Sequence, residues 1–200
     1  MKASSLIRKQ IQELPKGTPF TASMFFKAGS RAAIDQTLSR LARAGKIQRI
    51  TRGVFARPKE SRFVGKVPPS SHQIVRAMAK ASGGTVHISG AEAARKLGLS
   101  TQVPTTPVYY TSGRGRRFHI GNLEVTLKHV SPRKLALGER PAGEALSALW
   151  HMGKTRVTPE VIGHIKSKLP VAEYAALKNA AAFMPEWMAD ALRHYERQHA

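Results

Sequence analysis

The sequence lacks cysteine and long apolar runs. Without cysteine, disulfide bonds and thiolate metal sites are excluded, and nothing indicates an oxidising compartment. The amino terminus has no apolar signal-peptide core, and no run approaches the roughly 20 apolar residues that a membrane span needs. These absences predict a cytoplasmic protein with no membrane partner.

Acidic residues are also scarce. The 200 residues contain 12 Asp and Glu against 33 Lys and Arg, which gives a formal net charge of +21. A charge of this size attracts polyanions, so a nucleic acid is the first candidate partner, ahead of an acidic protein or an anionic membrane. The alternative is a basic surface kept for solubility, but such a surface normally contains more interspersed acids.

The few acids are scattered, and this argues against metal-dependent catalysis. Hard cations need clustered carboxylates, whereas the acids near the middle of the chain are dispersed, namely Glu92, Glu124, Glu139 and Glu144. The eight histidines form no pair at metal-ligand spacing with a carboxylate partner. We therefore expect no catalytic residues, no metal and no cofactor, and we do not expect an enzyme.

The segment 30–45 is the most informative stretch. Ser30 is a good N-cap and Gly45 can end a helix in the left-handed conformation, so both ends of a helix over 31–44 are specified locally. At 100° per residue, Ile34, Leu38 and Leu41 share one side of this helix. The opposite stripe contains Ala32, Gln36, Ser39 and Arg43, with Arg40 at its edge. One face is suited to a core and the other to a polyanion.

Two shorter helices are expected before this one and a hairpin after it. Ile7, Ile11 and Leu14 lie on one face of a first helix capped by Ser4 or Ser5. Thr21, with Phe20 before it and Phe25 after it, predicts a capped and stapled helix over 22–27. Residues 46–50 and 54–57 flank Thr51-Arg52-Gly53, which predicts a β-hairpin with arginine at its tip. This order predicts a winged helix-turn-helix domain over residues 1–60.

In such a domain the third helix enters the major groove of duplex DNA. We expect its first turns to contact base edges through Ser30, Arg31, Ala32 and Gln36. We expect phosphate contacts from Lys27, Arg40, Arg43, Arg49 and Arg52. The alternative is a solvated face on a structural helix, but no Glu lies four residues before Arg40 or Arg43 to pair with them.

The rest of the chain predicts a linker and a mixed domain. Proline and serine over 61–70 indicate a linker, and residues 71–200 then form a second domain with a helical end. Its elements are a helix capped by Ser71, a strand at 85–88, a helix after Ser89-Gly90, a loop over 99–107 and strands at 108–111, 118–120 and 123–127. The turns between these three strands predict a small antiparallel meander, so the fold class is α+β.

The turn before the second of these strands carries Arg114, Arg116 and Arg117. This cluster is either a second basic site that follows a phosphate backbone or a solubilising turn. Four helices follow, the first starting at Ala142, the second opened by Thr158-Pro159 and the last two punctuated by Pro170 and Pro185. We expect their large apolar residues to be core rather than to line a partner groove, namely Tyr174, Leu177, Phe183, Trp187 and Leu192.

Two motifs resemble a known family. The segment 88–104, ISGAEAARKLGLSTQVP, and the Gly-Lys-Ile…Arg-Gly-Val-Phe hairpin resemble the AbiEi-type abortive-infection antitoxins over roughly residues 1–150. Such antitoxins join a winged-helix domain to an antitoxin domain, repress their own operon and counteract a co-encoded nucleotidyltransferase toxin. The resemblance implies the same two roles here, with operator DNA as one partner, its site an inverted repeat, and the toxin as a functional partner.

Two other functions stay open at this point. One is a stand-alone regulator or architectural DNA-binding protein without a toxin, and the other is an RNA-directed enzyme or its accessory. A neighbouring nucleotidyltransferase-like reading frame would favour the antitoxin over the stand-alone regulator. A discrete protected operator separates both DNA-binding functions from the RNA-directed one.

Overall fold

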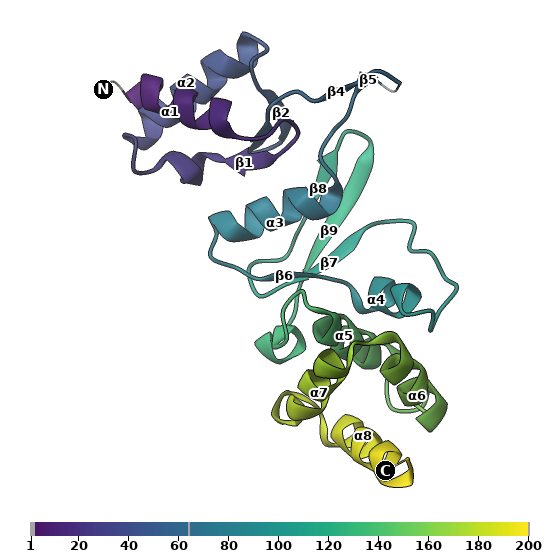
Figure 1. Ribbon diagram of the computed structural model, residues 1–200. Helices are drawn as coiled ribbons and strands as arrows, with labels where there is room; N and C mark the ends of the chain where they lie inside the picture. The colour runs from purple at the N-terminus through teal and green to yellow at the C-terminus, as the bar shows by residue number, and fades with distance from the viewer. Residues whose placement is uncertain (1–2, 64, 200) are drawn as a thin grey trace. The chain divides into compact units, whose positions relative to one another are not determined.

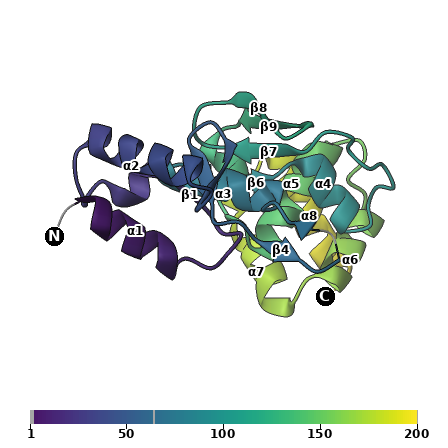
Figure 2. The ribbon, with the colours of Figure 1, turned by 90° about the horizontal axis from the view of Figure 1, so that it is seen from above.

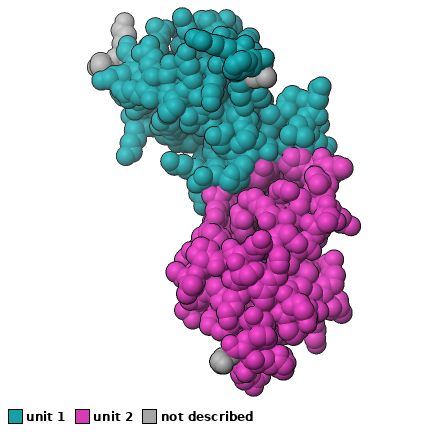
Figure 3. Space-filling model, turned by 45° about the vertical axis from the view of Figure 1, so that its right-hand side comes forward, with its two compact units in different colours: residues 1–84, 117–125 teal, residues 85–116, 126–200 magenta. Residues whose placement is uncertain are grey.

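A computed structural model describes residues 3–63 and 65–199 and has the predicted α+β class (Figure 1). The chain divides into two compact units, coloured separately in Figure 3. Unit 1 comprises residues 1–84 and 117–125, and unit 2 comprises residues 85–116 and 126–200. These limits differ from the predicted domains 1–60 and 71–200 because residues 71–84 and 117–125 pack within unit 1.

Unit 1 combines short helices with two small antiparallel sheets. Its elements are α1 (Ala3–Glu13), β1 (Pro19–Thr21), the 3-10 helix η1 (Ala22–Phe25), α2 (Arg31–Arg43), β2 (Gln48–Thr51), β3 (Val54–Ala56), β4 (Glu60–Ser61), β5 (Gly65–Lys66) and α3 (Ser71–Ala81). The strands pair in the orders β1-β3-β2 and β4-β5. The predicted hairpin is present as β2–β3, and β1 is an additional strand on its other side.

The predicted apolar faces form the core of unit 1. Ile7 and Ile11 of α1 and Ile34 and Leu38 of α2 are buried in one cluster with aromatic residues of β1, η1 and β3. The view from above in Figure 2 shows α1 and α2 as neighbouring helices. Each buried aliphatic side chain contributes roughly 1.5–3 kcal/mol, so α2 is held through its apolar face while its other face stays in water.

Both predicted ends of α2 are confirmed. The Ser30 hydroxyl accepts a hydrogen bond from the Ala33 amide at 3.3 Å, and Gly45 has φ of +68°. The short helix before α2 was predicted too long. It is a 3-10 turn that ends at Phe25, and the predicted cap at Thr21 does not form, because the Thr21 hydroxyl bonds to the Ser23 hydroxyl instead of an amide.

A second apolar cluster lies under α3. Val54, Ile74 and Met78 are buried there, and Phe118 and Ile120 of β8 (Arg116–Ile120) pack against them. α3 begins one residue earlier than predicted, since a capping box with Gln73 makes Ser70 its N-cap. Residues 117–125 therefore belong to the compact body of unit 1, although they are distant from it in sequence.

Unit 2 is mainly helical. Its elements are β6 (Val86–Ile88), α4 (Gly90–Lys96), β7 (Val108–Thr111), the 3-10 helix η2 (Pro132–Leu135), α5 (Pro141–Met152), α6 (Pro159–Lys168), α7 (Val171–Asn179), the 3-10 helix η3 (Ala181–Phe183) and α8 (Glu186–Gln198). β9 (Leu123–His129) passes from unit 1 into unit 2. Loop 99–107 is confirmed as irregular.

The predicted meander is wrong in one pairing. The strand order is β6-β7-β9-β8, and β7 pairs with β9 in parallel, whereas β6 pairs with β7 antiparallel. The inner position goes to β9 because it buries Val125 and Leu127, while β8 carries exposed Arg116, Arg117 and His119 that suit an edge strand.

The helices of unit 2 share one core around α5, as predicted. Leu146 and Leu149 of α5, Leu177 of α7 and Met188 of α8 are all fully buried. A Cβ added to Gly143 would lie 2.1 Å from the Gly138 carbonyl oxygen, so this close approach requires glycine. Phe183 was predicted as core but is 45% exposed, because η3 is a single turn that leaves its ring at the surface.

Candidate nucleic-acid interface

The predicted base-contacting residues lie together at the start of α2 and are exposed. Ala32 and Gln36 present their side chains to solvent on the side opposite the buried Ile34 and Leu38, and Arg31 is exposed in the first turn of the helix, on the same side as Leu38. Ser30 is exposed as well, but its hydroxyl is already used as the helix cap. A surface partner could therefore meet three side chains with hydrogen-bonding or methyl groups within about two helical turns.

Arg31 is held by two neighbours that the sequence analysis did not single out. Its Nε donates to the Asp35 carboxylate at 2.8 Å, and its guanidinium lies 5.7 Å from the centre of the Phe26 ring. Both ion-pair partners are more than half exposed, so the pair contributes little to stability. Its effect is to orient the guanidinium. The Arg31-x-x-x-Asp35 spacing was the sequence signal for this pair.

The predicted phosphate-contacting residues are also exposed. Lys27 precedes α2, and Arg40 and Arg43 extend from its last turns. Arg43 also donates to the Ser39 hydroxyl at 3.3 Å, on the same exposed stripe. Two cations and one hydroxyl thus lie along the carboxyl-terminal half of the helix, a spacing that suits successive phosphates of one strand.

The β2–β3 hairpin adds two further cations. Arg52 is exposed in the turn between the strands, and Arg49 is exposed on β2 with its guanidinium 5.4 Å from the centre of the Phe55 ring. Arg57, which follows β3, has a structural role instead. It donates to the carbonyl oxygens of Gln12 and Leu14, and so closes the end of α1.

The second basic cluster keeps both of its interpretations. Arg114, Arg116 and Arg117 are exposed at the turn into β8. The turn has internal support, because His129 Nδ1 lies 2.9 Å from the Gly113 carbonyl oxygen. This geometry is compatible with a backbone-contacting tip and with a solubilising turn.

Charge is distributed unequally between the two units. Unit 1 contains 18 Lys and Arg against four Asp and Glu, a net charge of +14. Unit 2 contains 15 against eight, a net charge of +7, and from residue 141 onward the numbers are seven and six. Even complete pairing of its acids would leave most cations of unit 1 without a carboxylate.

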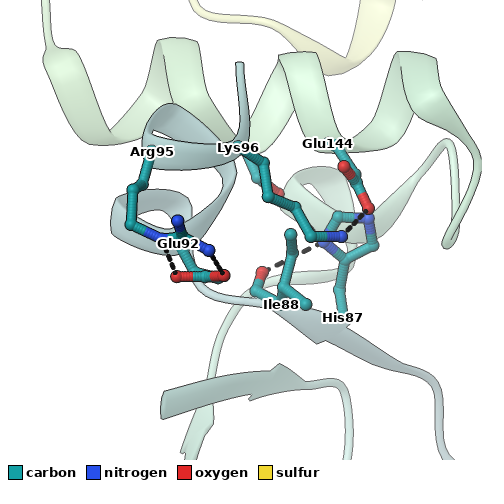
Figure 4. A network of polar contacts seen from close by, with 7 residues as sticks. His87, Ile88, Glu92, Arg95, Lys96 and Glu144 are labelled. Carbon is teal, nitrogen blue, oxygen red and sulfur yellow. Dashed lines mark hydrogen bonds and ion pairs between the residues drawn. The ribbon is translucent and has the colours of Figure 1, made fainter. Parts of the chain in front are cut away.

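In unit 2 many cations form ion pairs that join its helices. Lys96 of α4 donates to Glu144 of α5 at 3.0 Å, and Arg95 binds Glu92 with two hydrogen bonds within α4 (Figure 4). The hydrogen bond from Arg95 lowers the pKa of Glu92. The Lys96–Glu144 pair therefore joins segment 88–104 to α5, whereas the Arg95–Glu92 pair is internal to α4.

Glu196 of α8 is the centre of a second network. It accepts hydrogen bonds from Lys178 of α7 at 2.7 Å, from Lys166 of α6 at 3.0 Å and from the Tyr174 hydroxyl at 3.1 Å. The hydrogen bond from Lys178 is the largest cause that lowers the pKa of Glu196 to about 2. Burial raises the pKa of Tyr174 above its ordinary range. This network links three helices of unit 2.

Within residues 3–63 and 65–199, His, Asp and Glu side chains form no group of three or more that could hold a metal ion. In the same part of the chain, the helices are too short or too polar to cross a bilayer.

Residues 6–176 match DUF6088, a family of unknown function, and the chain belongs to this family. The match covers most of α1, all of α2 to α6 and both elements of the candidate interface. Among curated proteins, none matches the chain.

Proposed function

We propose that this DUF6088 protein is a sequence-specific, DNA-binding transcriptional repressor whose unit 1 contains a winged helix-turn-helix. The observation that carries the proposal is α2, a helix with a buried aliphatic face and an exposed face that presents Gln36, Arg40 and Arg43, with Arg31 exposed in its first turn. The β2–β3 hairpin with Arg52 at its turn supplies the wing. The net charge of +14 in unit 1 supports a polyanionic partner.

In this proposal the first turns of α2 read the major groove. Arg31 donates two hydrogen bonds to guanine O6 and N7, Gln36 pairs with adenine N6 and N7, and the Ala32 methyl contacts a thymine methyl. Asp35 keeps the Nε of Arg31 occupied, so that the two terminal nitrogens of the guanidinium face the base. Arg31 and Gln36 then specify sequence, whereas Lys27, Arg40, Arg43, Arg49 and Arg52 bind phosphates.

We further propose that the protein is the antitoxin of a type IV toxin–antitoxin system and represses its own operon. The support is the resemblance of segment 88–104 and of the wing to AbiEi-type antitoxins. The partner of the antitoxin function is then a co-encoded nucleotidyltransferase toxin, and the operator is expected to contain inverted repeats that can recruit two copies of the protein.

Footprinting on the fragment upstream of the protein's own gene tests the DNA-binding proposal. We expect one discrete protected site, and an affinity whose logarithm falls with log salt at a slope near −5 if about six phosphates are contacted. Replacement of Arg31 by Ala should cost about 1–3 kcal/mol at one base position, whereas Arg52→Ala should weaken binding to all sequences alike. Equal losses on operator and random duplexes for Arg31→Ala would reject its assignment to a base.

The antitoxin role is tested separately, by growth rescue. Cells that express a neighbouring nucleotidyltransferase-like gene are supplied with the full chain, or with a full chain carrying Arg40→Gln, Arg43→Gln and Arg52→Gln. We expect both chains to rescue growth, and only the unsubstituted chain to repress the promoter. If neither rescues growth while repression persists, the protein is a stand-alone regulator.

A further inference from the structure

The β4–β5 hairpin of unit 1 has an unusual tip. The Phe63 side chain is 95% exposed, although a phenylalanine normally buries most of its surface. It follows Arg62 in the turn between Glu60–Ser61 and Gly65–Lys66, and its amide donates to the Ser61 hydroxyl at 3.3 Å. In Figure 1 the hairpin projects from unit 1. An exposed aromatic ring at the tip of a β-hairpin is positioned to insert into a partner molecule.

The flanks of the tip are basic. Lys59, Arg62 and Lys66 are exposed around one acid, Glu60. This arrangement is complementary to a polyanion. It also disfavours a second copy of the same hairpin as the occupant, because identical clusters of cations repel each other.

A groove connects the hairpin to the proposed wing. It has a volume of about 360 Å³ and is lined by Arg49 of β2, Lys66 of β5, Pro68 and Ile120. Arg49 is already a proposed phosphate contact, and Lys66 lies on the opposite lining segment of the same groove. The basic surface therefore continues from the wing to the base of the hairpin within unit 1.

We propose that the β4–β5 hairpin is a second DNA-contacting element, in which Phe63 inserts as a wedge between two base pairs at the edge of the operator. Arg49 and Lys66 bind the phosphates that flank this step. Apolar side chains inserted from the minor groove unstack one step and bend the duplex, and flexible steps such as TA and CA yield most easily. The proposal rests on the proposed function, because it extends the same interface.

The inserted ring should change the conformation of the operator as well as the affinity of the protein for it. Base–aromatic stacking favours insertion, and the cost of unstacking the step offsets part of that gain. We therefore expect Phe63→Ala to lower the affinity for the operator only about five- to tenfold. The bend and the unstacked step, in contrast, should disappear altogether.

Permanganate reactivity of thymines, combined with DNase footprinting on the upstream fragment, tests the wedge. With the unsubstituted protein we expect one hyperreactive thymine at an edge of the footprint. With Phe63→Ala the footprint should persist and the hyperreactive thymine should be lost, and with Phe63→Leu, which keeps an apolar wedge, the reactivity should be kept. Fluorescence energy transfer between dyes on the two ends of the duplex should show the bend with the unsubstituted protein and with Phe63→Leu. It should show no bend with Phe63→Ala.

Two controls separate a local effect from a general one. Phe183→Ala removes an exposed phenylalanine of unit 2, and Val171→Ala removes an apolar residue that is 88% exposed there. Both variants should leave the footprint and the reactive thymine unchanged. Because Phe63 is almost wholly exposed, Phe63→Ala should also keep the thermal unfolding midpoint of the unsubstituted protein.

The outcomes distinguish the two proposals. A footprint without a reactive thymine, or one whose reactivity survives Phe63→Ala, overturns the wedge and leaves the repressor in place. The absence of any footprint overturns the repressor itself, and the wedge with it.

Discussion

The two units differ in how far their acidic residues can pair with their Lys and Arg residues. In unit 1, four acids stand against 18 Lys and Arg, and exposed guanidinium groups occur on α2 and on the hairpin that follows it. In unit 2, eight acids stand against 15, and Lys96, Arg140, Lys166 and Lys178 each bind a carboxylate on another helix or segment. Ion pairs in unit 2 join separate helices, whereas unit 1 has too few acids to pair with most of its cations.

This difference shows why net charge alone is a poor guide to function. Unit 2 would still be called basic at +7, yet residues 141–200 are almost neutral, and Lys166 and Lys178 bind Glu196 of α8. What points to a ligand is a set of cations without enough acids nearby, on a rigid element whose other face is buried. Substitutions in the two units should therefore have separable effects.

The largest effect is expected from three cations of unit 1. Arg40→Gln, Arg43→Gln and Arg52→Gln together should lower the affinity for duplex DNA by about 100-fold or more, and should change the salt slope from near −5 to about −2. Titrations at several salt concentrations measure both. A matched variant of unit 2, with Lys154, Lys168 and Arg197 replaced by Gln, removes the same charge and should keep affinity and slope nearly unchanged. Equal losses in both variants would contradict the comparison.

The proposed base contact of Arg31 should give the next largest effect when it is removed. Arg31→Ala should cost about 1–3 kcal/mol on the operator and much less on random duplex, because the lost hydrogen bonds are to one base. The affinity of each protein for a set of operators, with every base-pair substitution at each position, measures this loss. The result should be relaxed preference at one position only.

In unit 2 the matching experiment removes an acid. Glu196→Gln should lower the free energy of unfolding by about 1–2 kcal/mol at pH 7, since partial exposure screens the lysines that it binds. The folded pKa of about 2 lies below the ordinary value of 4.5, so this stability is present above pH 4.5 and is lost as the pH falls toward 2. Denaturant unfolding at several pH values should show the two proteins converging in acid. DNA affinity at pH 7 should not change.

Two smaller effects concern the positioning of α2. Ser30→Ala removes the N-cap and should destabilise unit 1 by about 1 kcal/mol, with the operator sequence unchanged. Thermal unfolding of the two proteins measures this difference.

Asp35→Asn should leave stability nearly unchanged, because the ion pair with Arg31 is exposed. It should instead weaken the preference for guanine at the position read by Arg31, since the guanidinium is less firmly oriented. If Asp35→Asn bound the operator with unchanged preference, Asp35 would have no positioning role.

Local sequence signals predicted much of the fold. The helix over 31–43 could be predicted because Ser30, Gly45 and the spacing of Ile34, Leu38 and Leu41 act within the segment itself. The helices from α5 to α8 were also predicted from local signals, α5 from the spacing of its apolar residues and α6 to α8 from proline at their starts.

Features that depend on distant contacts were missed. The parallel pairing of β7 with β9 is decided by which strand buries Val125 and Leu127, and the turns between the strands carry no information about it. The β4–β5 hairpin lay in a segment that proline and serine made look like a linker. In the candidate interface, the exposed cations were predicted from the sequence. The contacts that Arg31 makes with the Asp35 carboxylate and the Phe26 ring were found only in the structure.

The central claim, that α2 and the β2–β3 hairpin read a specific duplex, is tested most directly by competition binding. Labelled upstream fragment is titrated with the protein and then challenged with the same fragment unlabelled, or with a scrambled duplex of equal length and composition. The account predicts that the scrambled duplex competes at least 1,000-fold less well, within the ordinary range for specific DNA-binding proteins. Identical competition by the two duplexes would contradict it.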